Sequence, residues 1–159
     1  MPSVTPFLWF DSQAEEAAEL YTSVFPNSKI RHVSRWGEAG PGEPGSVMTV
    51  EFELDGQPVT ALNGGPEFAF TEAFSFQVSC ETQEDVDRYW SALSDGGEEG
   101  PCGWLKDRYG LSWQIVPTAL LRLIGDPDPE RAQRAFAAMM KMGKLDIAEL
   151  ERAADGVPA

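Results

Sequence analysis

The sequence predicts an α+β fold built from two repeated modules, and three observations support this prediction. Short apolar segments typical of strands alternate with amphipathic helical segments, the order strand, helix, three strands occurs twice, and the last part of the chain is helical throughout. The 159 residues, 42% of them hydrophobic, are enough to bury a substantial core. We therefore expect one domain at 1–117, in which paired βαβββ modules at about 1–66 and 70–117 form a curved mixed sheet with a cleft. A helical C-terminal extension at 118–159 would pack on the domain or on a dimer partner.

The first module begins with an apolar, aromatic run at 4–10 that is typical of a strand. A helix is expected next, because Ser12 and Glu15 have the spacing of a capping box. Three further strands are expected, at 30–36, 46–54 and 58–62. An Asp-Gly pair at 55–56 predicts a tight turn between the last two. The glycine-rich stretch at 37–45 has no lysine and no helix after it, so we interpret it as a flexible surface loop.

The second module repeats this order. Residues 73–80 alternate between apolar and polar side chains, as a strand with one buried face does. Thr82 and Asp85 mark a helix start, and the Gly-Gly pair at 96–97 ends that helix. Strands are then expected at 98–102, 103–106 and 111–116. The extension contains a short helix near 120–124, a second that starts at Asp128-Pro129, and a last one capped by Asp146.

The composition restricts the partners. A net charge of −14 would repel a phosphate backbone or an anionic membrane surface, so we expect neither nucleic acid nor membrane as a partner. The sequence shows no basic leader and no apolar run long enough to span a bilayer, which predicts a cytoplasmic protein. Cys80 and Cys102 have neither metal-site nor redox-motif spacing and are interpreted as reduced, packed thiols.

Several motifs resemble the PhnB-like family, which also carries the label 3-demethylubiquinone-9 3-methyltransferase and belongs to the vicinal-oxygen-chelate (glyoxalase, bleomycin resistance, dioxygenase) superfamily. They are the stretches 5–11, 17–21 and 25–26, followed by 61–66, 80–84, 100–107 and 110–117. The resemblance covers essentially the whole chain and implies paired βαβββ modules, usually in a homodimer. It does not imply methyl transfer. Methyltransferases commonly bind their cofactor at a glycine-rich turn between a parallel strand and a helix, and this sequence offers no such turn.

The resemblance also implies where a metal would be held. Metal-dependent members of the superfamily place a histidine or glutamate on each of four inward-facing strands, where a divalent ion polarises substrate oxygens. The matching positions in this chain are Pro6, Ala61, Ser75 and Gln114. None carries a charge, and a shift by one residue gives no better set. We therefore expect a cleft without a metal and no other cofactor.

Strand alternation predicts the lining of this cleft. The polar candidates are Asn63, Gln77, Gln114, Ser75 and Ser112, and the others are Leu8, Phe10 and Trp104. Neutral amides of this kind orient a ligand carbonyl or hydroxyl, or they satisfy one another and the nearby backbone. Trp104 is a candidate for either a cleft contact or a dimer contact.

Three hypotheses for function follow. The first is a metal-free, homodimeric, bleomycin-resistance-like protein that binds a small apolar or aromatic molecule. The alternative is a metal-dependent lyase, isomerase or dioxygenase-type enzyme, which would need ligands from His32, Glu51 or Glu53. A third is a dimer whose helical extension recruits another protein. Bound metal would favour the second hypothesis, and loss of a protein partner on deletion of the extension would favour the third.

Overall fold

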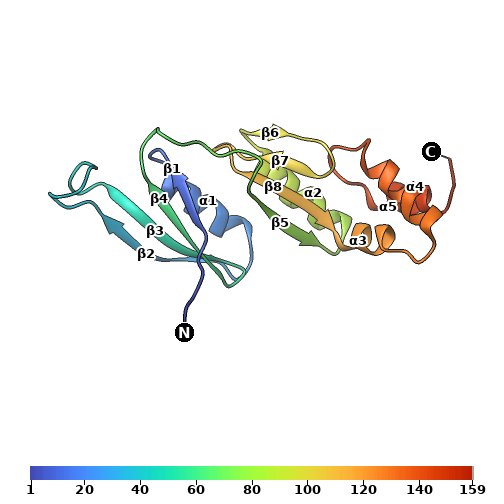
Figure 1. Ribbon diagram of the computed structural model, residues 1–159, viewed down its shortest axis with the longest axis horizontal. Helices are drawn as coiled ribbons and strands as arrows, with labels where there is room; N and C mark the ends of the chain where they lie inside the picture. The colour runs from blue at the N-terminus through green and yellow to red at the C-terminus, as the bar shows by residue number, and fades with distance from the viewer. Residues whose placement is uncertain (159) are drawn as a thin grey trace. The chain divides into compact units, whose positions relative to one another are not determined.

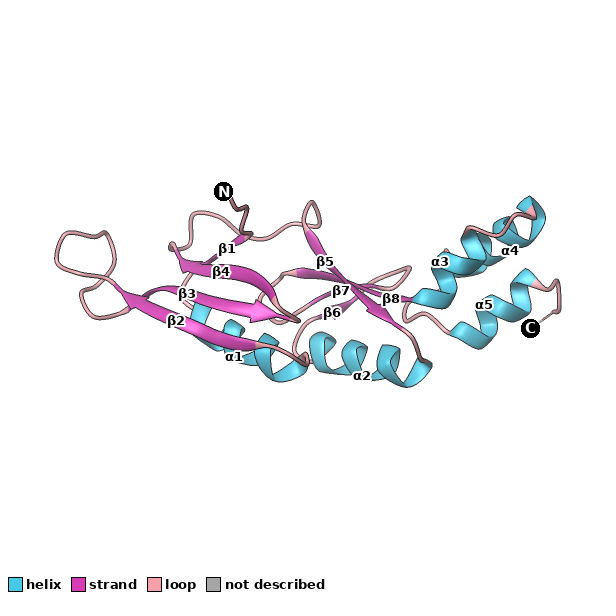
Figure 2. Ribbon diagram, turned by 90° about the horizontal axis from the view of Figure 1, so that it is seen from below, coloured by secondary structure: helices cyan, strands magenta, loops and turns pink. Residues whose placement is uncertain are grey.

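The computed structural model describes residues 1–158, which divide into two compact units, Met1–Phe70 and a second that begins at Thr71. Each unit contains one four-stranded mixed sheet with a helix against one of its faces, as Figures 1 and 2 show. The order strand, helix, three strands occurs in both units, and three helices follow the second. The predicted α+β class with two βαβββ modules is therefore confirmed. No helix within residues 1–158 combines the length and apolar character needed to cross a membrane.

The first unit contains β1 (Phe7–Phe10), α1 (Ala14–Val24), β2 (Lys29–Arg35), β3 (Val47–Leu54) and β4 (Gln57–Asn63). Its sheet has the order β1-β4-β3-β2, in which β1 and β4 are parallel and the other pairs are antiparallel. Helix α1 covers one face, where the Tyr21 ring lies 6.3 Å from the Phe52 ring. The turn between β3 and β4 has positive φ at Asp55 (47°) and Gly56 (79°), which confirms the predicted Asp-Gly hairpin.

The two faces of the first sheet are the reverse of those predicted. Leu8 and Phe10 were expected to line a cleft, but they are 2% and 3% exposed and lie in the core. Leu8 is in register with Ala61, and Ala61 with Val50, on the same face as Phe52 and therefore beneath α1. Phe7, 64% exposed, lies on the opposite face. The pattern could not distinguish the faces, because all four residues of β1 are apolar or aromatic and no alternation is visible.

The start of α1 also differs from the prediction. The helix begins at Ala14. Gln13 is its N-cap residue, but the Gln13 side chain makes no capping hydrogen bond. The free Ala14 amide instead donates to Asn63 Oδ1 at 2.8 Å, from the end of β4. The expected capping box of Ser12 and Glu15 is therefore wrong, because a residue 49 positions further along the chain supplies the acceptor.

The second unit contains β5 (Ser75–Cys80), α2 (Gln83–Ser94), β6 (Glu98–Glu99), β7 (Trp104–Lys106) and β8 (Ser112–Pro117). Its sheet has the order β5-β8-β7-β6, with only the β5–β8 pair parallel. Thr82 caps α2 by accepting from the Asp85 amide at 3.1 Å, as predicted. Leu105, Trp113 and Ile115 are at most 2% exposed and share the face that α2 covers. Here the predicted assignment of faces is confirmed.

Three helices complete the second unit: α3 (Thr118–Ile124), α4 (Pro129–Met139) and α5 (Ile147–Ala154). Asp128 and Asp146 cap α4 and α5 through their carboxylates, as expected. A buried cluster that includes Val116, Leu120 and Leu150 joins these helices to the end of β8. Gln83 of α2 adds polar contacts, because it accepts from the Ile147 amide at 2.8 Å and donates to the Leu145 carbonyl at 3.0 Å. The helical extension thus packs on the second module of its own chain.

Candidate functional site

Most of the predicted polar candidates lie together on the face of the second sheet that α2 does not cover, which we call the open face. Two rows of side chains cross it. The serine row contains Ser75, Ser112, Lys106 and Glu98, in register across all four strands. The glutamine row contains Gln77, Gln114 and Trp104. The two rows therefore place polar side chains beside the Trp104 indole on one face of the sheet.

The glutamine row has spare hydrogen-bonding capacity. Gln114 Nε2 donates to Ser75 Oγ at 2.9 Å, so these two predicted candidates satisfy each other in part. Gln77 is exposed, and its Nε2 lies a long 3.5 Å from Ser79 Oγ. Trp104 is half-buried beside them. An amide has two donors and an acceptor with two lone pairs, so both glutamines can still bind a ligand.

Ser112, on the open face, has a buried hydroxyl. Its side chain is buried, with 1% exposure, yet its Oγ has no hydrogen-bond partner among residues 1–158. A buried hydroxyl without a partner costs about 1–3 kcal/mol. Ser112 lines a cavity of about 180 Å³ together with Trp104, Lys106 and Glu72; we call it the Ser112 cavity. A buried hydroxyl without a partner, on a residue that lines a cavity, is a candidate for a ligand contact.

The charge of Lys106 is already compensated at this cavity. Its Nζ lies 2.5 Å from Glu72 Oε1. The hydrogen bond and attraction of Glu72, helped by Glu98, raise the pKa of Lys106 above its usual value, and Lys106 lowers the pKa of Glu72 in turn. Both side chains are exposed to water, so the pair adds little stability. Lys106 is therefore a protonated, paired cation and not a proton acceptor.

Lys106, Glu98 and Glu72 were not predicted from the sequence. Lys106 could have been found, because it is two residues after Trp104 in a three-residue strand and therefore shares its face. Glu98 was harder to find, because β6 has only two residues and its register depends on the hairpin to β7. Glu72 precedes β5, and no pattern in the sequence indicates its ion pair.

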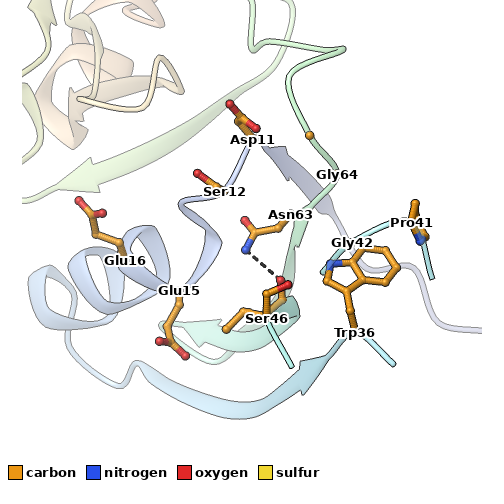
Figure 3. A pocket seen from close by; sticks show the side chains of 12 residues that line it. Asp11, Ser12, Glu15, Glu16, Trp36, Pro41, Gly42, Ser46, Asn63 and Gly64 are labelled. Atoms are coloured by element: carbon orange, nitrogen blue, oxygen red, sulfur yellow. Dashed lines mark hydrogen bonds between the residues drawn. The ribbon is translucent and has the colours of Figure 1, made fainter. Parts of the chain in front are cut away.

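Asn63 takes the second of the two roles left open for the amides, because its side chain is bonded to nearby backbone groups. It belongs to the first unit and lines a cavity of about 490 Å³ with Trp36, Ser46 and the start of α1, shown in Figure 3. Both polar atoms of its side chain are hydrogen-bonded. Oδ1 accepts from the Ala14 amide at 2.8 Å, and Nδ2 donates to the Val47 carbonyl at 3.1 Å. Asn63 thus ties α1 and β3 to the end of β4.

The glycine-rich loop beside this cavity is folded against an indole. A Cβ at Gly40 would lie 2.4 Å from the Trp36 ring, and one at Gly42 would lie 2.2 Å from Trp36 Nε1. The loop closes through hydrogen bonds of the Trp36 backbone with Ser46 and Gly45, each 2.9 Å long. The glycines are therefore needed for close approach to Trp36, which the interpretation as a plain flexible loop did not foresee.

The open face of the first sheet carries the residues that a metal-dependent alternative would need. His32 is in register with Glu51, and Glu53 forms a 2.8 Å ion pair with Arg31. These residues line a shallow cavity of about 470 Å³. Within residues 1–158, no three histidine, cysteine, aspartate or glutamate side chains are grouped so that they could hold a metal ion.

The residues at the positions where the resemblance would place metal ligands do not fit a divalent ion. Ala61 is in the core beneath α1, 1% exposed, so the open-face residue beside it is Thr60. In the second unit the corresponding open-face residues are Ser75 and Gln114. Hydroxyls and amides are weak neutral ligands, whereas these ions are held by imidazole, thiolate or carboxylate groups.

Comparisons with known proteins agree with this architecture. A family model described as 3-demethylubiquinone-9 3-methyltransferase matches residues 2–116. A solved structure from Bacillus cereus, described as a PhnB protein with the same activity label, is 38% identical and covers 73% of this chain and 99% of its own, with a TM-score of 0.65. A comparison with proteins of curated function found no match.

Two more distant structures show the fold alone. Protein PA1353 from Pseudomonas aeruginosa is 16% identical and covers 74% of this chain and 98% of its own, with a TM-score of 0.61. The fosfomycin resistance protein FosX from Mesorhizobium loti is 14% identical and covers 70% and 87%, with a TM-score of 0.50.

The activity in the family's label finds no support in the structure. The turns that lead from β1 into α1 and from β5 into α2, residues 11–13 and 81–82, contain no glycine. Both sheets are mixed rather than parallel and doubly wound. The match over residues 2–116 and the 38% identity to the Bacillus PhnB protein show that this chain belongs to the PhnB-like family, described as 3-demethylubiquinone-9 3-methyltransferase.

Proposed function

We propose that the protein binds a small, partly aromatic molecule without a metal, and that the ligand contacts the open face of the second sheet. The observation that carries this proposal is the Ser112 hydroxyl, which is buried, unpartnered among residues 1–158, and adjacent to a cavity with an indole wall. A buried hydroxyl without a partner destabilises the folded protein, and a ligand that forms a hydrogen bond to it removes that penalty.

The glutamine row supports a binding role rather than a catalytic one. Gln77 and Gln114 can orient a ligand, and Trp104 offers an apolar wall. Neither an amide nor a hydroxyl is a competent base near neutral pH, and Lys106 is kept protonated by its carboxylate partners. The open face therefore favours recognition of a molecule over proton transfer.

A homodimer is part of the proposal. Large apolar side chains remain exposed in each unit: Phe7 (64%) in the first, and Met140 (55%) and Phe136 (44%) in the second. Exposed apolar side chains of this size are often buried in a protein interface. Sedimentation velocity over a range of concentrations should give the mass of two chains, and a single-chain mass at micromolar concentration would contradict the dimer.

The binding proposal is tested by NMR with a library of neutral aromatic fragments and protein stripped of metal by a chelator. We expect saturable shifts at the Ser112 and Gln114 amides and at the Trp104 indole. Gln114→Ala should weaken these effects, whereas Gln57→Ala, an exposed glutamine of the first unit, should not change them. Stoichiometric metal in the native protein, or binding that appears only after zinc, nickel, manganese or iron is added, would contradict the metal-independent proposal.

A further inference from the structure

We infer that the Ser112 cavity selects a ligand whose head group is an N–H donor on a flat ring, and that it discriminates against a carboxylate of the same shape. This inference rests on the proposed function and adds the chemical class of the ligand. It follows from the balance of donors and acceptors around Ser112, from the charges beside it and from the size of the cavity.

The cavity lining offers more acceptors than free donors. Carboxylates of Glu72 and Glu98 contribute acceptor oxygens, and the unpartnered Ser112 hydroxyl can accept through its lone pairs as well as donate. The backbone amides at this end are already used, since the Gly100 amide donates to the Trp104 carbonyl at 2.9 Å and the Trp104 amide donates to the Pro101 carbonyl at 3.0 Å. A head group with N–H donors therefore complements the lining better than one with only acceptors.

The charged side chains beside Ser112 also disfavour a carboxylate ligand. Lys106 could attract an anion, but its ammonium group is bound to Glu72 at 2.5 Å, and Glu98 lies directly across from it in the serine row. One cation between two carboxylates leaves a net negative charge at this part of the cavity. An incoming carboxylate would have to displace Glu72 and would face Glu98 at short range, which costs binding free energy.

The size and the wall of the cavity indicate a single ring. The cavity of about 180 Å³ has room for several water molecules. A monocyclic aromatic head group is of this size, and it can pack against the half-buried Trp104 indole. If the head group is also cationic, the indole face adds an attractive cation–π contact.

Three probes of nearly identical shape separate these effects: benzamidine, a cation with N–H donors; benzamide, neutral with N–H donors; and benzoate, an anion without them. Each is titrated into the full-length ¹⁵N-labelled chain at pH 7 while the Ser112 amide and the Trp104 indole resonances are followed. We expect benzamidine and benzamide to bind with millimolar dissociation constants, and benzoate to bind at least about tenfold more weakly.

Two variants identify the groups that discriminate. Ser112→Ala should weaken benzamide and benzamidine about fivefold, the contribution of one neutral hydrogen bond, whereas Ser23→Ala on the exposed side of α1 should have no effect. Glu98→Gln should weaken benzamidine and strengthen benzoate with little change for benzamide, and Glu43→Gln in the first unit should change none of them. Glu98 is exposed, so its variant should fold even if Ser112→Ala does not.

Equal affinity for benzoate and benzamide would overturn the inference, and so would unchanged benzamide binding by Ser112→Ala. Failure of all three probes to shift the open-face resonances would also overturn it. None of these results removes the proposed function, which fails if no fragment of the neutral library binds the open face or if binding requires a metal. The two claims can therefore be judged separately.

Discussion

Replacing Ser112 with alanine should stabilise the protein without ligand, although the same change should weaken ligand binding. The Ser112 side chain is 1% exposed and its hydroxyl has no partner among residues 1–158. Its removal therefore sacrifices no hydrogen bond of the unliganded protein and relieves the cost of burying a polar group.

The magnitude follows from the position of the hydroxyl. An unsatisfied buried group costs about 1–3 kcal/mol, and we expect the lower end because the residue lines a cavity. Ser112→Ala should thus raise the free energy of unfolding by about 1 kcal/mol. For a chain of this length, that corresponds to an increase in Tm of about 2–4 °C.

Urea unfolding followed by far-UV circular dichroism measures this change, and Ser75→Ala is the matched control. Ser75 is in register with Ser112 on the same face, but its Oγ accepts from Gln114 Nε2 at 2.9 Å. Its removal should lower stability by about 1 kcal/mol, because a satisfied hydrogen bond is lost. If Ser112→Ala destabilises the chain as much as Ser75→Ala does, the hydroxyl is not an unsatisfied group and the reasoning fails.

Three other perturbations test the rest of the structure. Asn63→Ala removes both hydrogen bonds that tie α1 and β3 to β4, so the free energy of unfolding should fall by about 2 kcal/mol in urea titrations; a loss below about 0.5 kcal/mol would refute the connecting role. Gly42→Ala places a Cβ 2.2 Å from Trp36 Nε1, so the indole must move, and its fluorescence should shift to that of a more solvated tryptophan; an unchanged spectrum would contradict this packing. Burial raises the pKa of Cys80 to about 11, so this thiol should resist alkylation at pH 8 until urea unfolds the chain. Because the folded pKa is the higher one, the contribution of Cys80 to stability is complete below the unfolded pKa and is lost as the pH rises towards 11, and rapid labelling of Cys80 in the folded protein would contradict its burial.

The two sheets show where alternation of polar and apolar residues along a strand predicts the buried face and where it does not. In β5 and β8, polar and apolar side chains alternate, so the open face with Ser75, Gln77, Ser112 and Gln114 followed directly from the sequence. In β1 every residue is apolar or aromatic, so Leu8 and Phe10 were assigned to the wrong face. A period of two identifies a face only where the two faces differ in polarity.

Hydrogen bonds between residues far apart in the chain could not be predicted from the sequence. Ser12 and Glu15 had the spacing of a capping box, yet α1 is capped by Asn63 from the other end of the module. The local pattern has no information about an acceptor that only the folded sheet brings near. Caps from within the local sequence, at Thr82, Asp128 and Asp146, were predicted correctly because donor and acceptor are within three residues of each other.

The central claim is that the open face of the second sheet binds a small molecule without a metal. The most direct test is a set of ¹H–¹⁵N spectra of the metal-stripped chain, recorded with increasing amounts of the neutral fragment that binds it best. We expect saturable shifts confined to the serine and glutamine rows, and the same shifts when a divalent metal is added. Shifts centred on the Asn63 cavity of the first unit, or binding that requires a metal, would contradict it.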